Sequence, residues 1–548
     1  MICNLVKEYL IPTRIVGKSE NILNAEALFA NRKEQISFHQ DNCLICAGRG
    51  YIILDFGREL QGGIRMLSHY VEGQKYNTDI RIRFGESYGE VCAELGEKNA
   101  KNDHSTRDMV VKVPELSDME WGQTGFRFVR IDFLSPTHVV WRVVNIYAAY
   151  THRDLQYKSE FKSDDPLVNE IYDTARYTVF LNMQHSLIEG IKRDRLVWAG
   201  DMQPEVLAIT DIFGADVCVE DAIRKAYEEC PLPGWMHMPT YSFWVIQVIV
   251  DYYMKVRNTA FVNEWLPIVE AIVEQLNSCV SEDGTIDFSR RNDFRTKNPF
   301  FLDWPTKDKP CARAGCRYVF IFVLRNLTAL LSELGKSTEL CEKLVKKLSS
   351  FKENLTDAAK QVVAFGYLAG QIDKETAALK LLDGGAKGLC TYHSYFILRA
   401  IAESAGVEKA VDIMKEYYGG MLSRGATTFW EDFNVEWLDG SGRIDEPTPA
   451  GLKDLHGDYG NYCYKGFRHS LCHGWSCGPV QFLTEYVLGI KVQESGCRKI
   501  AVNPNMAGLK HLNAKFPTPY GVVCVMVTVE NGEAIVQINA PNEVEIIR

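Results

Sequence analysis

The sequence predicts a multidomain protein in which a central all-α (α/α)6 toroid is flanked by an N-terminal β-sandwich and a small C-terminal β-domain. Three observations predict it. Strand patterns fill residues 1–155, helical periodicity fills residues 156–488, and strand patterns return over residues 489–548. The length of 548 residues also exceeds what one ordinary core encloses, so several domains are expected.

The N-terminal region carries short segments in which apolar and polar residues alternate, as they do in half-buried strands. Strands are predicted at residues 51–56, 80–84, 126–133 and 139–149. The last of these is rich in β-branched residues, and turn signals separate the segments, which favours an antiparallel sandwich. Residues 88–108 are polar and are predicted to form a long loop.

Helical periodicity begins near Pro166, with Asp164 or Asp165 as the expected N-cap. Further helices are predicted at about 201–214, 217–229, 241–252, 260–280, 313–334, 337–350, 372–382, 392–404, 407–417 and 475–488. No strand–helix alternation occurs, which disfavours a Rossmann fold or a TIM barrel. A ring of helical hairpins fits the number of helices. A helical-repeat solenoid is the alternative, although no repeat of fixed period is visible.

The C-terminal region returns to strand patterns. A turn at residues 516–521 precedes an apolar strand at 522–527, and Asn531-Gly532 is a strong hairpin signal before a strand at 534–538. A last strand is expected at 544–547. This region is therefore predicted to be a small sheet docked on the helical body.

Composition limits the partners. The chain is 46% hydrophobic and 24% charged with a net charge of −10, which argues against a nucleic-acid or anionic-membrane partner. Its 16 cysteines are scattered without paired CxxC motifs, as expected for reduced thiols. No signal-peptide pattern and no run of about 18 apolar residues is present. These features predict a cytoplasmic protein and leave its oligomeric state, a homo-oligomer included, open.

The stretch from Glu189 to Asp201 concentrates the residues that can carry chemistry. It holds three carboxylates, three cations and Trp198 within thirteen residues. One interpretation is the acidic floor of a pocket with an aromatic wall, suited to a polyhydroxylated ligand. The other is a buried ion-pair network at a helix junction.

Tryptophan stands near Asp, Glu or His at four further places: residues 234–237 together with 241–244, then 302–305, 425–432 and 469–475. Most tryptophans of this kind are core residues. Repetition favours a sugar site, because carboxylates accept hydrogen bonds from hydroxyls and aromatic faces pack on sugar rings. His469 and His473 are four apart beside Cys472 and Cys477, but no HExxH surrounds them. No metal and no cofactor is predicted.

Several of these motifs resemble those of one enzyme family. Residues 193–201, Arg-Asp-Arg-Leu-Val-Trp-Ala-Gly-Asp, resemble the Arg-Glu-Arg-Leu-Gly-Trp-Thr-Gly-Asp signature of the bacterial α-L-rhamnosidases of glycoside hydrolase family 78. Similar motifs of that family follow the same order along the chain, at residues 54–59, 303–304, 427–431, 470–473 and 517–521.

The resemblance implies the three-domain architecture and an inverting exo-glycosidase that removes terminal α-L-rhamnosyl or similar deoxy-sugar residues, with a carbohydrate substrate and no cofactor. Asp194 stands at the position of the family's general acid and Glu431 at that of its proposed general base. Substrate-binding roles are implied for Glu189, Arg193, Trp198, Asp201, Trp235, Asp303, Trp304, Trp430 and His473.

Two departures from the family pattern keep other functions open. Asp194 is one methylene shorter than the family's Glu, and Glu189 is one methylene longer than the usual Asp. A displacement of about one bond length in a catalytic group can cost orders of magnitude in rate. The alternatives are a catalytically weak or inactive carbohydrate-binding homologue, and a six-hairpin enzyme for another sugar, such as a phosphorylase or a uronyl hydrolase.

Overall fold

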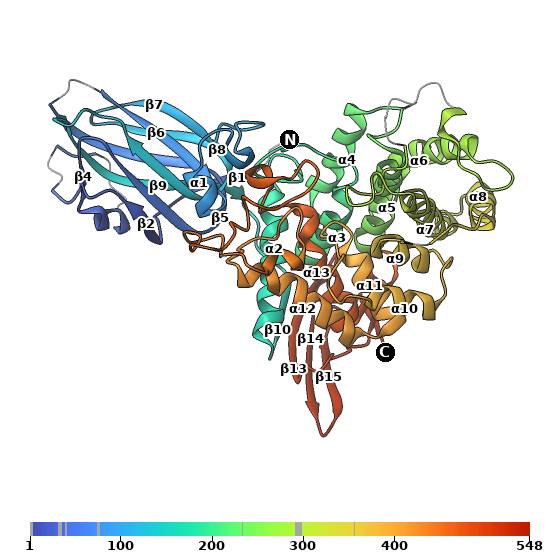
Figure 1. Ribbon diagram of the computed structural model, residues 1–548. Helices are drawn as coiled ribbons and strands as arrows, with labels where there is room; N and C mark the ends of the chain where they lie inside the picture. The colour runs from blue at the N-terminus through green and yellow to red at the C-terminus, as the bar shows by residue number, and fades with distance from the viewer. Residues whose placement is uncertain are drawn as a thin grey trace.

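The computed structural model describes residues 4–30, 36–38, 41–73, 77–232, 234–290, 299–355 and 357–548. Figure 1 shows an N-terminal β region on one side, a helical region on the other, and a set of C-terminal strands that project from the helical region. The prediction of a multidomain chain with helical and sheet regions and a small C-terminal sheet domain is confirmed.

The described N-terminal residues form one antiparallel sheet of nine strands, in which the order is β3-β4-β9-β5-β8-β6-β7 and β1 and β2 pair with β9 and β5. The strands are β1 (Leu5–Leu10), β2 (Arg14–Lys18), β3 (Ile22–Leu23), β4 (Leu44–Ala47), β5 (Gly50–Glu72), β6 (Asn77–Gly85), β7 (Asp108–Pro114), β8 (Asp118–Phe133) and β9 (Val140–Arg153). The long β5 changes register against β8 and β9, where residues insert and bend the strand.

The predicted loop at 88–108 contains a short helix, α1 (Tyr88–Cys92). Its N-cap is Ser87, whose Oγ accepts a hydrogen bond from the backbone N–H of Glu90 at 3.1 Å. Glu90 in turn accepts from the N–H of Glu86 at 2.8 Å. Ser-x-x-Glu is a helix-start signal that the polar character of this stretch concealed.

Most of the predicted helices are present within two or three residues of the expected bounds. They are α2 (Pro166–Asn182), α3 (Met202–Phe213), α4 (Val217–Glu229), α5 (Pro239–Val256), α6 (Thr259–Cys279), α7 (Cys311–Glu333), α8 (Glu339–Ser350), α10 (Lys374–Leu382), α11 (Ser394–Ala405) and α12 (Val407–Ser423). Helices α5 and α12 run clearly beyond their predicted ends, at Val256 and Ser423, and α9 (Lys360–Leu368) is not among the predicted helices.

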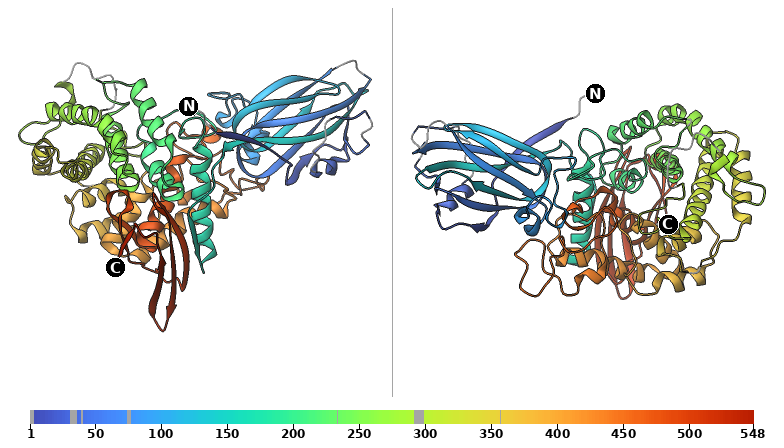
Figure 2. Two further views of the ribbon diagram at one scale, coloured as in Figure 1. Left: turned by 180° about the vertical axis from the view of Figure 1, so that it is seen from behind. Right: turned by 45° about the horizontal axis from the view of Figure 1, so that its top comes forward.

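The helices pack in sequence around a circuit. Helix α3 packs on α5, α5 on α7, α7 on α9, α9 on α11, α11 on α13 (Gly478–Phe482), and α13 packs back on α3. Helices α6, α8, α10 and α12 each pack against members of this circuit: α6 on α5, α8 on α7, α10 on α9 and α11, and α12 on α11. The right-hand view of Figure 2 shows the helices curving round in an arc.

Helix α7 is long and apolar enough, by length and composition, to cross a membrane. However, 78% of the most apolar window of this helix is buried inside the protein. It packs against α5, α8 and α9, which is the environment of a core helix. Arg313, Arg317 and Arg325 interrupt its apolar run, which explains why the sequence shows no continuous apolar span.

The helix predicted at 475–488 is not continuous. A 3-10 turn (Gly474–Cys477), α13 and a π-helical turn (Leu483–Val487) follow one another. Pro479 has no N–H to donate, so an α-helix cannot run through it from residue 475. His473 is extended, with φ −136° and ψ 126°, so His469 and His473 do not share a helical face.

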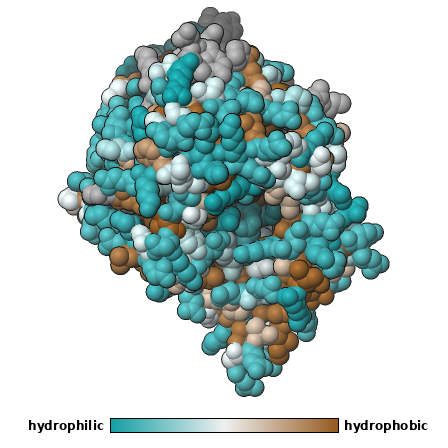
Figure 3. All heavy atoms as spheres, turned by 90° about the vertical axis from the view of Figure 1, so that its right-hand side faces the viewer, coloured by the Kyte–Doolittle hydropathy of each residue, from teal (hydrophilic) through white to brown (hydrophobic). Residues whose placement is uncertain are grey.

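The C-terminal strands form two small sheets. One contains β10 (Glu160–Ser163), β13 (His511–Thr518), β14 (Gly521–Glu530) and β15 (Glu533–Asn539), and the other contains β11 (Ile490–Glu494), β12 (Lys499–Val502) and β16 (Glu545–Ile547). Asn531 and Gly532 turn between β14 and β15 with positive φ, as a tight hairpin requires. Figure 3 shows a mostly hydrophilic face, with hydrophobic residues gathered near the lower tip.

Candidate active site

A cavity of about 300 Å³ opens between the loop that follows α2, the start of α5, the loop before α7 and the segments that follow α12. Charged and aromatic side chains line it together. The lining residues are Glu189, Arg193, Asp194, Trp198, Asp201, Met238, Tyr241, Phe301, Trp304, Lys307, Glu431, Cys463, Tyr464, His473 and Trp475.

The loop from Glu189 to Asp201 is irregular and is held by its own hydrogen bonds. The Glu189 carboxylate accepts from the N–H of Leu196 at 2.8 Å, and the Glu189 carbonyl accepts from the N–H of Gly474 at 2.7 Å. Asp194 and Arg195 lie in the left-handed region with φ of 53° and 56°. Non-glycine residues rarely adopt that conformation, and two in succession turn neighbouring side chains in different directions.

Glu431 forms the shortest ion pair among the described lining residues, with Arg193. Both of its carboxylate oxygens lie 2.5 Å from Nη2 of Arg193, and Oε2 also accepts from the N–H of Ser470 at 3.3 Å. The Glu431 carbonyl accepts from Thr391 Oγ1 at 2.6 Å and from Trp475 Nε1 at 3.0 Å. Burial raises the pKa of Glu431, and the charge of Arg193 opposes that shift. The carboxylate is therefore fixed in place at the cavity wall.

Asp194 contacts the same guanidinium from the other side. Its Oδ1 lies 3.3 Å from Nη1 of Arg193, 3.3 Å from Nε2 of His104 and 3.9 Å from Nη2 of Arg468. The Asp194 side chain is 25% exposed, whereas that of Glu431 is 4% exposed. One arginine thus stands between two carboxylates, one of which is accessible and one of which is buried.

Three further carboxyl groups lie in and behind the cavity floor. Burial, and then the neighbouring carboxylates, raise the pKa of Glu189 and of Glu205 well above the ordinary value. The pKa of Asp201 is raised in the same direction, mainly by burial. Oε1 of both Glu189 and Glu205 is buried without a hydrogen-bond partner among the described residues. A raised pKa favours the neutral carboxyl form, which can donate a hydrogen bond.

Aromatic rings form the walls. Trp304 meets Phe301 edge-on with 5.3 Å between ring centroids, and Nζ of Lys307 lies 4.9 Å from the Trp304 centroid. The ring centroids of His473 and Trp475, which also line the cavity, are 4.1 Å apart. Burial, and then Arg193, lower the pKa of His473 well below its usual value, so this imidazole is neutral. The cavity therefore combines apolar ring faces with carboxyl groups.

Eight predicted site residues meet at this cavity, and three lie outside its lining. Trp235 is buried against Phe288, and Trp430 packs on Phe433. Asp303 is buried and accepts hydrogen bonds from the N–H of Thr306 at 2.9 Å and from Gln361 Nε2 at 2.6 Å. These bonds hold the loop that carries Trp304, so the contribution of Asp303 to the cavity is indirect.

Sequence reasoning assigned no role to several lining residues. Tyr241 and Trp475 lie in aromatic segments that were noted, whereas Met238, Phe301, Lys307, Cys463 and Tyr464 were not considered. The segment Tyr462-Cys463-Tyr464, which precedes Arg468, is the sequence pattern that could have indicated a further aromatic wall of the cavity. Met238 and Phe301 carry no signal that separates them from ordinary core residues.

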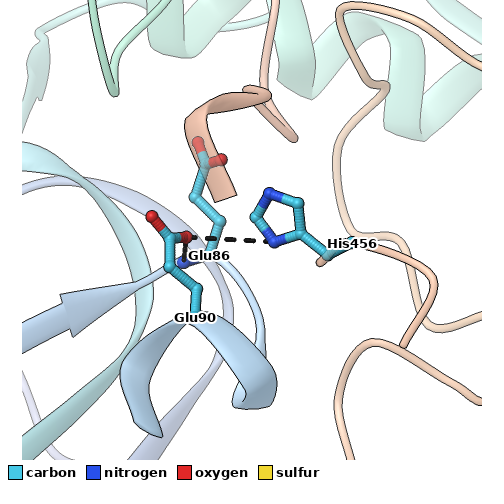
Figure 4. Close-up of side chains that lie close together, drawn as sticks. All are labelled: Glu86, Glu90 and His456. Atoms are coloured by element: carbon cyan, nitrogen blue, oxygen red, sulfur yellow. Dashed lines mark hydrogen bonds and ion pairs between the residues drawn. The ribbon is translucent and has the colours of Figure 1, made fainter. Parts of the chain in front are cut away.

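A second group of buried charges lies where the β region meets the helical region. We call Glu86, Glu90, Lys192 and His456 the junction cluster; Figure 4 shows its two carboxylates and the imidazole close together. Three ligand atoms at this spacing could hold a metal ion. Lys192 Nζ, however, lies 3.2 Å from Glu86 and 3.0 Å from Glu90, and donates to the carbonyl of His469 at 2.6 Å. The ammonium group already supplies the positive charge here.

Comparisons with known proteins identify the fold. Residues 489–547 match the family model of the bacterial alpha-L-rhamnosidase C-terminal domain. No curated protein matches the chain. The match to that family model confirms the resemblance at the C-terminal domain.

Among solved structures, the GH78 family rhamnosidase of Bacillus sp. GL1 is similar with a TM-score of 0.74 and 20% identity, over 96% of this chain and 55% of that one. A rhamnosidase from Klebsiella oxytoca with rhamnose bound has a TM-score of 0.66 and 19% identity, over 88% of this chain and 96% of that one. The Streptomyces avermitilis alpha-L-rhamnosidase complexed with L-rhamnose has a TM-score of 0.69 and 13% identity, over 99% of this chain and 50% of that one.

At these identities the solved structures show a shared fold, and the fold is that of the family predicted from the motifs. This chain spans about half the length of the Bacillus and Streptomyces proteins.

Proposed function

We propose that this protein is an inverting exo-glycoside hydrolase that removes terminal α-L-rhamnosyl, or similar deoxy-sugar, residues. One observation carries the proposal: Asp194 and Glu431 contact opposite nitrogens of the Arg193 guanidinium at the wall of one aromatic-lined cavity. Glycoside hydrolysis needs two carboxyl groups placed across the scissile bond. The fold shared with known rhamnosidases, two of them with rhamnose bound, supports the choice of sugar.

In the proposed mechanism Asp194 gives its proton to the glycosidic oxygen as the bond from that oxygen to the anomeric carbon breaks. Glu431 accepts a proton from water, and the water oxygen bonds to the anomeric carbon from the opposite face. The products are the free sugar with inverted configuration and the released alcohol. Inversion requires the carboxyl groups to stand roughly 6.5–9.5 Å apart, so that a water molecule fits between them. The intervening guanidinium supports a separation wider than that of retaining enzymes.

The shape and chemistry of the cavity support a small terminal sugar. Its volume of about 300 Å³ lies at the lower end of small-molecule sites. The carboxyl groups of Glu189 and Asp201 lie where they can form hydrogen bonds with sugar hydroxyls. The rings of Trp304 and Trp198 offer apolar faces to the ring carbons and to the methyl group of a deoxy sugar.

The proposal includes three finer statements. The helical region is an (α/α)6 toroid, supported by the circuit of contacts that returns from α13 to α3. The N-terminal strands form a sandwich, supported by the register shifts that bend β5. The protein is cytoplasmic, supported by the scattered and mostly buried positions of the described cysteines, which are typical of reduced thiols.

Hydrolysis of an aryl α-L-rhamnoside tests the proposal, with Asp194→Asn and Glu431→Gln beside the wild type. We expect hydrolysis by the wild type and a large loss of rate in both variants, with the product anomer inverted by NMR. Glu375→Gln, on the exposed side of α10, is the matched control. Unchanged rates in both site variants would remove the catalytic assignments, and a retained anomer would remove inversion.

A carbohydrate-binding protein without turnover is the second candidate. The observation that favours it is the crowding of Asp194, whose Oδ1 faces Arg193, His104 and Arg468 together. Asp194 is one methylene shorter than the family's acid, and a side chain held in this way can fall short of the glycosidic oxygen. L-rhamnose would then raise the melting temperature while a panel of aryl glycosides remained intact.

A further inference from the structure

Three consecutive residues of the N-terminal region reach the candidate active site. Asp103 accepts a hydrogen bond from Nε of Arg468 at 2.8 Å, and Ser105 Oγ donates to the carbonyl of Lys192 at 3.0 Å. Between them, Nε2 of His104 lies 3.3 Å from Oδ1 of Asp194. The loop thus contacts the segment 192–194 and also Arg468, whose guanidinium lies near Asp194.

The same loop is fixed to its own sheet. The Asn102 side chain accepts from the N–H groups of Arg107 and Asp108 at 2.9 and 3.0 Å. Buried Arg107 donates to the carbonyl of Gly125 at 2.6 Å and pairs with Glu90 at 3.1 Å. The position of His104 is therefore set by the N-terminal sheet and not by the loop alone.

Backbone strain occurs on both sides of the contact. His104 has φ of 64° and Asp194 has φ of 53°, both in the left-handed region. Histidine and aspartate are among the non-glycine residues that tolerate this region, and strained residues gather at functional sites. The two unusual conformations together bring one imidazole nitrogen against one carboxylate oxygen.

We propose that His104 is a positioning residue for Asp194 and that the N-terminal region thereby completes the active site. This inference rests on the proposed function. Aspartate is short, and rotation about its last bond moves its oxygens. His104, Arg193 and Arg468 all approach Asp194 at Oδ1. They hold that oxygen in place, so that Oδ2 presents its proton to the leaving oxygen.

The test exploits the dependence of acid catalysis on the leaving group. The dinitrophenolate of a dinitrophenyl glycoside can leave without being protonated. The alkoxide of an alkyl glycoside leaves only when an acid protonates its oxygen. His104→Asn keeps a residue that tolerates positive φ but is too short to reach Asp194. His104→Gln restores an N–H donor at about the reach of Nε2. His138→Asn, at an exposed position of the same region, is the control.

We expect His104→Asn to lower kcat/KM for the alkyl α-L-rhamnoside roughly 10- to 100-fold, through kcat, and for the dinitrophenyl α-L-rhamnoside less than about twofold. His104→Gln should recover most of the loss, and all variants should unfold at the wild-type temperature. Equal losses on both substrates, or none, overturn the inference while the proposed function stands. A wild type that hydrolyses neither substrate overturns both.

Discussion

The cavity and the junction cluster bury the same kinds of charge but differ in access. In the cavity Arg193 pairs with Glu431, and in the junction cluster the neighbouring Lys192 pairs with Glu86 and Glu90. Glu431 and Glu86 accept hydrogen bonds from adjacent backbone groups. The N–H of Ser470 donates to Glu431, and the N–H of Leu471 donates to Glu86. Two sites with similar composition are therefore connected through two adjacent residues.

What separates them is space beside the carboxylate. Glu431 faces a cavity with Trp304 and Trp475 on its walls. In the junction cluster, the carboxylates of Glu86 and Glu90 are instead surrounded by side chains, among them His456 and Arg107. The comparison teaches that buried ion pairs do not mark a catalytic site by themselves. An opening with ring faces beside the pair is the additional feature that favours ligand chemistry.

The largest expected effect tests the cavity side of this comparison. Glu431→Gln removes the proposed base while keeping the shape of the side chain, so kcat/KM should fall by about 1,000-fold or more. Steady-state kinetics on an aryl α-L-rhamnoside measures it, with circular dichroism to show that the variant is folded. A loss below about tenfold would place the base elsewhere.

The junction cluster should respond in stability instead. Lys192→Met leaves Glu86 and Glu90 buried without their ammonium partner, so the free energy of unfolding should fall by about 3–5 kcal/mol. Urea denaturation measures it. Lys387→Met, which removes an exposed pair with Glu436, is the control and should change little. If Lys192→Met unfolds at the wild-type urea concentration, the cluster does not join the two regions.

Aromatic walls should contribute to binding and little to folding. Trp304→Ala removes a partly exposed ring face, so KM should rise about tenfold with a small change in melting temperature. Trp121→Ala, a partly buried tryptophan of the N-terminal sheet outside the cavity, should leave KM unchanged. The same KM in both variants would show that the ring faces of the cavity do not hold the sugar.

The smallest expected effect concerns the carboxyl behind the cavity floor. The raised pKa of Glu205 means that the folded protein favours its neutral form. Its stabilising contribution is present at low pH and is lost as pH rises through the folded pKa. Glu205→Gln is always neutral, so its melting temperature should exceed that of the wild type by about 1–2 °C at pH 8 and not at pH 5. A gain that is equal at both pH values would contradict this account.

The succession of strands and helices was predictable from the sequence because periodicity reports which face of an element is buried. Helix α9 was not predicted because it is mostly apolar and shows no alternation of polar and apolar faces. The last helix was predicted as continuous although it contains Pro479. The register of the long β5, with its shifts, depends on partners far along the chain, which local patterns do not encode.

The site was predictable as a set of segments and less as a set of side chains. Lys192 and Arg193 are adjacent, yet one enters the junction cluster and the other the cavity. Trp430 and Glu431 are divided in the same way between core and cavity. These residues lie in irregular loops, where no period tells which side chain faces which way. The contact of His104 with Asp194 could not be predicted from the sequence, because it joins two regions that fold around separate cores.

The pairing of β10 with β13 has a consequence for biosynthesis. Strand β10 leaves the ribosome before the helical region, and its partner is translated only after that region is complete. The sheet that joins them can therefore close only after the helical region has been translated, and pairing across so long a separation is a slow kind of step. Until then the unpaired edge of β10 is exposed on the nascent chain, where a chaperone or a neighbouring polypeptide can bind it.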